Sequence, residues 1–128
     1  METTGHNTPL SPDECRQLLR SQTVGRIGWS SRVGQVILPV SYVLRDDQIV
    51  FRTAVGSVLS DLVTPQQVCF EIDDLDAETL TGWSVTVQAE TAPAREPEHS
   101  PLPWAPGERP VFVQLTPSAF SGRVIAAS

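Results

Sequence analysis

Apolar and polar residues alternate along most of this chain, and a period of two is typical of β-strands that bury one face. The alternation is clearest in residues 35–44 and 83–90, where every second side chain is apolar. Shorter stretches of the same kind cover residues 23–30, 48–53, 67–73 and 110–115. The pattern therefore predicts six strands, with residues 122–125 extending or capping the sheet.

Two segments depart from this period and predict short helices. Ser11 is placed to cap a helix N-terminus, and Glu14 three residues later completes a capping box. An apolar stripe follows, so we expect an amphipathic helix that ends near Ser21. Residues 58–63 predict a second helix of less than two turns, ended by Pro65.

Short strands, hairpin turns and few helices predict a mainly β fold, either an antiparallel barrel or a sandwich. The 128 residues fit one domain. We expect a disordered N-terminal tail over residues 1–10 and a single domain over residues 11–128. Residues 92–109 hold five of the 11 prolines, which indicates a loop. This segment is not a linker between two domains, because too little chain follows it to fold alone.

Charge and composition exclude several kinds of function. The net charge is −6 and every basic residue is an arginine, which excludes Schiff-base lysine chemistry and argues against a nucleic-acid partner. No apolar run reaches membrane-spanning length and no signal peptide is visible, so we expect a cytoplasmic protein without a membrane partner. Cys15 and Cys69 show neither a disulfide framework nor the spacing of metal ligands, and we expect no metal.

One strand end combines groups that favour an anion. Residues 48–53 run into the Gly56-Ser57 turn, which places Arg52, two hydroxyl groups and the free N–H groups of a short helix together. The plainer interpretations are an exposed strand-end arginine and a Ser57 that only caps the helix. Gly56 indicates a turn with a positive φ rather than a full phosphate-binding loop.

Other candidates depend on their position in the pattern. Ser41 interrupts an apolar strand just after Pro39, which cannot donate to a sheet, so a bulge beside a ligand or a solvent-facing position is expected there. Trp83 favours core or dimer packing. Trp104, in the proline-rich loop, favours a lid over a ligand or a second protomer. Arg123 is either a second anion contact or a surface arginine.

Six short motifs occur in a characteristic order: VGRI at 24–27, LPVSY at 38–42, FRTAVGS at 51–57, GWSVTV at 82–87, PW at 103–104 and SGR at 121–123. In this order and spacing the chain resembles the pyridoxamine 5'-phosphate oxidase-like flavin-binding split barrels, particularly their short actinobacterial members. The resemblance extends from about Ser11 to Val124. It implies a six-stranded antiparallel split β-barrel that forms a homodimer, with FMN or a deazaflavin coenzyme between the protomers.

The resemblance also implies where the cofactor lies. Residues 39–41 would border the flavin ring, while Arg52, Thr53 and the Gly56-Ser57 turn would approach the ring edge and the phosphate. Trp83, Trp104 and Arg123 would close the site or the dimer. The expected cofactor-binding residues are Pro39, Val40, Ser41, Arg52, Thr53, Gly56, Ser57, Val58, Trp104 and Arg123.

Two positions depart from the family. Val58 stands where the family usually has a lysine or arginine that pairs with the cofactor phosphate, and Val124 stands where a second arginine often follows Arg123. Losing one charge-assisted contact costs about 1.5–3 kcal/mol, or roughly tenfold to a hundredfold in affinity. FMN is therefore the expected cofactor, with a deazaflavin or no cofactor as the alternatives.

The expected function is a small oxidoreductase in which the flavin carries the redox chemistry and the protein supplies shape and charge. Its substrate is an unidentified small molecule. No side chain stands out as an obligatory acid or base, so no catalytic residue is assigned. The alternative is a module that binds or senses a flavin or deazaflavin without turnover, or a family member that has lost its cofactor.

Overall fold

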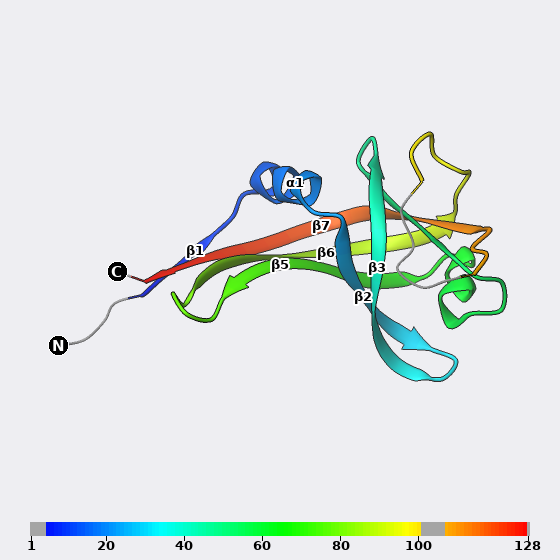
Figure 1. Cartoon of the computed structure of the whole chain (residues 1–128), viewed down its shortest axis with the longest axis horizontal. Helices are drawn as coiled ribbons and strands as arrows, with labels where there is room; N and C mark the ends of the chain where they lie inside the picture. The colour runs from blue at the N-terminus through cyan, green and yellow to red at the C-terminus, as the bar shows by residue number, and fades with distance from the viewer. Residues whose placement is uncertain (1–4, 101–106, 128) are drawn as a thin grey trace.

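The computed structural model describes residues 5–100 and 107–127, and these form one antiparallel sheet with two short helices (Figure 1). The strands are ordered β1-β7-β4-β3-β2-β5-β6, and β6 also pairs with β7. That additional pairing closes strands β2 to β7 into a six-stranded ring, so the predicted barrel is confirmed. The elements are β1 (Gly5–Pro9), α1 (Pro12–Ser21), β2 (Val24–Ser31), β3 (Gly34–Arg45), β4 (Gln48–Thr53), the 3-10 helix η1 (Val58–Val63), β5 (Gln67–Asp76), β6 (Thr81–Pro93) and β7 (Val111–Ala127).

The seventh strand, β1, corrects the expectation of a disordered tail. Residues 5–9 pair with the far end of β7, from Gly5 opposite Ala127 to Pro9 opposite Arg123. This segment is polar and does not alternate, so the sequence gives no strand signal there. It is recruited because β7 extends far enough to offer an unpaired edge. Residues 1–4 lie outside the described part of the chain.

Strand β7 is also longer than predicted, because it joins residues 110–115 and 122–125 into one element. Between these two parts of β7 the register with β6 shifts by one residue at a β-bulge: Ala89 faces Pro117, whereas Gln88 faces Ala119. Ser118 is the extra residue, and its hydroxyl donates to the carbonyl oxygen of Gln88 at 3.2 Å. Beyond this bulge β5, β6 and β7 continue as a long arm, with β1 along its edge (Figure 1).

The core fills the barrel interior and is closed by helix α1. Phe70 and Tyr42 meet edge to face with ring centroids 5.2 Å apart, and the Tyr42 hydroxyl donates to the carbonyl oxygen of Leu19 at 2.7 Å. Burial raises the pKa of Tyr42 above its ordinary value. The predicted capping box is present, since the Ser11 hydroxyl accepts from the Glu14 N–H at 3.2 Å while the Glu14 carboxylate accepts from the Ser11 N–H at 2.9 Å.

Alternation along the strands gives the barrel wall an inner and an outer side. On β4, Ile49 and Phe51 point into the core. Because side chains alternate along a strand, Val50 and Arg52 point outward. Val50 is nevertheless completely buried and stands apart from the core cluster. Chain outside the barrel therefore covers this part of the wall. No helix in the described residues has the length and apolarity needed to span a membrane.

Candidate functional site

The expected ring-binding strand β3 presents only part of its predicted set to the outside. Val40 is 7 % exposed and packs in the core, so only its backbone could border a ligand. Pro39 and Ser41 point to the opposite, outward side, opposite Arg26 and Val24 of β2. We call the outward side of β2, β3 and β4 the outer wall. Of the three residues expected to border the ring, only Pro39 and Ser41 can therefore offer a side chain to a ligand on that wall.

The Ser41 hydroxyl is unusual on this wall. Its oxygen is buried, and it is the one buried side-chain polar atom of the described residues without a hydrogen-bond partner. Buried hydroxyls are normally hydrogen-bonded, because leaving one unpaired costs about 1–3 kcal/mol. A group that the described chain does not supply, such as a ligand or a water molecule, is therefore expected to satisfy it.

Arg52, like Ser41, belongs to the outer wall. The last pair between β3 and β4 joins Tyr42 to Phe51, so Ser41 and Arg52 occupy the adjoining positions on the outward side. The Arg52 Nε donates to the carbonyl oxygen of Arg109 at 3.0 Å, and its guanidinium carbon lies 5.4 Å from the centroid of the Phe112 ring. The side chain is half-buried rather than extended into bulk water. A guanidinium held in this way can present the rest of its fork to an anion.

The Gly56-Ser57 turn is built as the plainer interpretation predicts. Gly56 has a φ of 78°, and Ser57 caps the 3-10 helix η1 by accepting from the Ser60 N–H at 3.2 Å. The Ser57 hydroxyl also bonds to the carbonyl oxygen of Ala54 and lies 2.8 Å from the Thr53 hydroxyl. Thr53 is only 1 % exposed. Both hydroxyl groups therefore stabilise the turn, and the structure does not direct either of them toward a ligand.

An arginine that sequence reasoning did not select lies close to the segment that contains Val58. Val58 is half-buried and packs against the core. Arg32, from the turn between β2 and β3, contacts residues on both sides of Val58: its Nη2 donates to the carbonyl oxygen of Gly56 at 3.0 Å and its Nε to the Asp61 carboxylate at 2.6 Å. The sequence shows only a hairpin turn at Arg32, and spacing alone cannot reveal that this turn folds onto a segment 24 residues later.

The remaining predicted site residues do not join this group. Trp104 lies outside the described residues. Arg123 sits on the arm, where its Nη1 donates to the Asn7 side chain at 3.1 Å. It is eleven residues along β7 from Phe112, the partner of Arg52, which corresponds to roughly 36 Å of strand. Within one chain, Arg123 is therefore excluded from the site around Arg52.

Large aliphatic side chains are exposed beside the outer wall. Ile37 lies two residues before Pro39 on the outward side of β3 and is 72 % exposed, and Val55 in the Gly56 turn is 76 % exposed. Val33 in the neighbouring hairpin is exposed as well. Arg32 ties that hairpin to the Gly56 turn, so these apolar groups belong to one end of the molecule. A surface of this kind is typical of a protein or ligand interface.

Comparison with known proteins agrees with this architecture. The family model described as pyridoxamine 5'-phosphate oxidase matches residues 11–124. An uncharacterised protein of Mycobacterium tuberculosis is 29 % identical over 131 residues, which cover 93 % of this chain and 86 % of that protein. The solved structure of an FAD binding protein from Mycobacterium smegmatis is 31 % identical, covers 93 % of this chain and 98 % of its own, and superposes with a TM-score of 0.74.

A Corynebacterium glutamicum protein assigned as a pyridoxamine 5'-phosphate oxidase is 25 % identical, with 94 % of this chain and 93 % of that chain covered and a TM-score of 0.78. The family match spans nearly the whole barrel, including β3, β4 and the Gly56 turn. The order of motifs, the closed six-stranded ring and these similarities agree. The chain belongs to the pyridoxamine 5'-phosphate oxidase family.

Proposed function

We propose that this chain binds a flavin against its outer wall and works as a small oxidoreductase on a small-molecule substrate. The observation that carries the proposal is the pair formed by Ser41 and Arg52. The buried Ser41 hydroxyl without a partner and the half-buried Arg52 guanidinium belong to strand positions on the same outward side of the barrel. Together they offer a hydrogen-bonding group and a cation to a ligand that is partly polar and anionic.

The residues fit a phosphorylated flavin in a defined way. Pro39 and the Ser41 hydroxyl would lie against the ring, and the backbone of Val40 would border it. The Arg52 fork would hold the phosphate, and Arg32 would supply the second positive charge near the turn, which Val58 cannot supply. Because Arg32 is already paired with Asp61, its net attraction for a phosphate is smaller than that of a free cation.

FMN is the form of flavin that we propose first. The relative from Mycobacterium smegmatis is described as an FAD binding protein, and FAD contains the same ring and the same first phosphate as FMN. Contacts around Ser41 and Arg52 therefore suit either form. A deazaflavin coenzyme is phosphorylated too, and its absorption spectrum distinguishes it from both.

A homodimer is the proposed working unit. The exposed aliphatic side chains of Val33, Ile37 and Val55 border the outer wall, and a second copy of the chain would bury them. At about 25 cal/mol per Å² of apolar surface removed from water, such burial contributes to association. It would also cover a flavin on the wall and keep water away from the ring.

When bound, a flavin supplies the hydride or electron transfer, and the chain binds it, orients it and excludes water. A second candidate function is a module that holds the flavin without turnover. The observation that favours it is the composition of the wall, since Pro39, Ser41 and Arg52 include no general acid or base at neutral pH.

The absorption spectrum of the purified protein, recorded before and after addition of FMN, FAD or a deazaflavin, tests the proposal. A bound flavin that is bleached anaerobically by NAD(P)H or a reduced deazaflavin, and then recovers with an acceptor, supports the oxidoreductase. Bound flavin without bleaching supports the binding module. A protein that binds none of these cofactors refutes both.

A further inference from the structure

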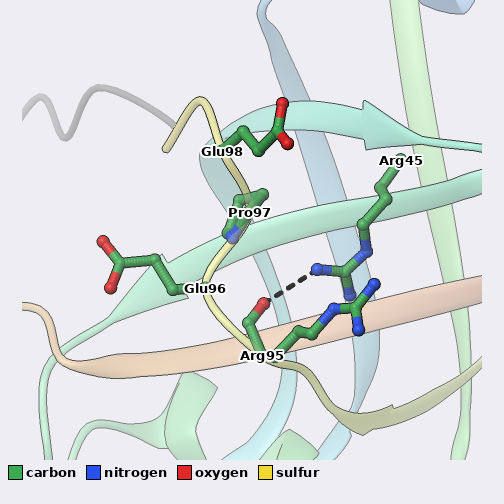
Figure 2. Close-up of a pocket in the computed structure, with 5 residues that line it drawn as sticks. All are labelled: Arg45, Arg95, Glu96, Pro97 and Glu98. Carbon is green, nitrogen blue, oxygen red and sulfur yellow. Dashed lines mark hydrogen bonds between the residues drawn. The ribbon is translucent and has the colours of Figure 1, made fainter.

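A cavity lined by two arginines lies apart from Ser41 and Arg52. It has a volume of about 410 Å³ and is lined by Arg45, Arg95, Glu96, Pro97 and Glu98 (Figure 2). Arg45 ends β3, whereas the other four residues belong to the segment that follows β6. The cavity is therefore formed where this segment crosses the end of the β3–β4 hairpin, and its volume is within the range of small-molecule sites.

The Arg45 side chain is held in place by neutral groups, so no carboxylate neutralises its positive charge. Its Nη1 donates to the carbonyl oxygen of Arg95 at 2.9 Å, and its Nη2 lies 3.4 Å from the side-chain oxygen of Gln114. Both acceptors are neutral. Among the described residues neither Arg45 nor Arg95 forms an ion pair with a carboxylate.

The two carboxylates of the lining do not neutralise the arginines. Figure 2 shows the guanidinium groups of Arg45 and Arg95 converging on one end of the cavity, while the carboxylates of Glu96 and Glu98 point away from them. The Glu96 carboxylate instead accepts from the Ser100 hydroxyl at 3.2 Å. Two like charges that converge without a counter-ion repel each other, which an anion between them would relieve.

The arrangement is notable in a chain whose net charge is −6. A chain with an excess of carboxylates offers many partners for an arginine. Here two arginines converge and neither is paired with a carboxylate. Guanidinium groups bind phosphate oxygens through two parallel hydrogen bonds, and two such groups match a phosphate ester or a diphosphate. Pro97, with its fixed φ, stiffens the segment that carries Arg95.

The cavity is distinct from the flavin phosphate position proposed at Arg52. Arg45 pairs with Gln48, and Gln48 precedes Arg52 by four residues on β4, or about 13 Å of strand. Arg45 and Arg52 both point outward, and both donate to carbonyl oxygens of the segment between β6 and β7. Two cationic positions therefore lie along one side of the barrel.

We propose that Arg45 and Arg95 form an anion-binding site for the phosphate groups of a small molecule. The phosphate could belong to the distal half of a dinucleotide flavin, or to a separate phosphorylated substrate. The site itself does not depend on flavin binding, because its cations, cavity and supporting hydrogen bonds are all formed by the chain alone.

Isothermal titration of ADP and of pyrophosphate into flavin-free protein tests the site directly, with adenosine as the ligand without phosphate. Wild-type protein should bind ADP and pyrophosphate, more weakly at 200 mM than at 50 mM salt, and should not bind adenosine. Arg95→Gln should weaken ADP binding at least tenfold. This variant keeps the Arg95 carbonyl oxygen to which Arg45 donates, so it should fold normally.

Arg45→Gln should weaken ADP binding to a similar degree, with circular dichroism confirming the fold. Arg20→Gln is the matched control, because it removes the same charge from an exposed residue on α1. Failure of wild-type protein to bind ADP at millimolar concentration would overturn the proposal. So would equal binding by Arg95→Gln and wild type, or an equal loss in Arg20→Gln.

Two further titrations distinguish the sources of the phosphate. If the site serves a dinucleotide flavin, Arg95→Gln should reduce affinity for FAD at least tenfold while leaving FMN affinity unchanged. If it serves a separate substrate, FMN-loaded protein should still bind ADP, and Arg95→Gln should abolish this binding without changing affinity for either flavin. Binding of ADP to flavin-free protein stands even if no flavin binds, so the two proposals can fail independently.

Discussion

Replacing Ser41 by alanine should have opposite effects on the free and the flavin-bound protein. Without a ligand, the buried hydroxyl has no partner among the described residues, and removing it relieves a desolvation cost of about 1–3 kcal/mol. For a chain of this length, 1 kcal/mol corresponds to a rise of about 3–5 °C in Tm. With a flavin bound, the same substitution removes a hydrogen bond worth about 0.5–1.5 kcal/mol. Because affinity reflects the difference between the free and bound states, these two opposite effects add, and flavin affinity should fall at least tenfold.

Thermal unfolding of flavin-free protein and fluorescence titration with FMN measure these two effects. Ser30→Ala is the matched control, because Ser30 is an exposed serine on the neighbouring strand β2, and it should change neither quantity. Loss of more than about 1 kcal/mol of stability in flavin-free Ser41→Ala would show that the hydroxyl already has a partner within the protein. Unchanged FMN affinity would show that it does not contact the ligand. Either result refutes the reasoning.

Three other substitutions have defined outcomes. Arg32→Ala should weaken FMN binding roughly 3- to 10-fold by removing the second positive charge near the turn, yet cost under about 1 kcal/mol of stability because the pair with Asp61 is exposed. An equal loss for riboflavin would assign the effect to the fold instead. Gly25→Ala should lower the free energy of unfolding in guanidinium chloride by about 1–3 kcal/mol, because a Cβ at Gly25 would lie 2.2 Å from the Cζ of Phe70; an unchanged midpoint would contradict this packing. Val58→Lys should reduce stability without tightening FMN binding, because Val58 packs against the core. Tighter FMN binding in a titration would show instead that position 58 faces the phosphate.

The parts of the fold that follow local rules could be predicted from the sequence. The strand over residues 48–53 is found with the predicted bounds, because a turn precedes it and its alternation of apolar and polar residues ends at Thr53. The helix after Ser11 is found because its capping box is a local motif. Strand β1 could not be predicted, because its only support is the edge of β7, which is made by the other end of the chain.

In the candidate site, too, only the features that follow from local sequence could be predicted. Alternation places Val40 with the apolar face of its strand, and the structure agrees with alternation rather than with a ring-contacting side chain. Arg52 lies at the end of its strand, as the alternation predicts, and its role toward a cofactor stays a prediction; its bond to the Arg109 carbonyl depends on a distant loop. Arg32 and the pair of Arg45 and Arg95 were missed because tertiary folding, not spacing, brings each of them to its position.

The central claim is that a phosphorylated flavin is held on the outer wall by Arg52. Isothermal titration of FMN and riboflavin into wild-type protein and Arg52→Ala tests it most directly. We predict that the substitution weakens FMN binding at least tenfold and leaves riboflavin binding nearly unchanged, because only FMN carries the phosphate. Equal losses for both ligands, or no binding of FMN to the wild-type protein, would contradict the account.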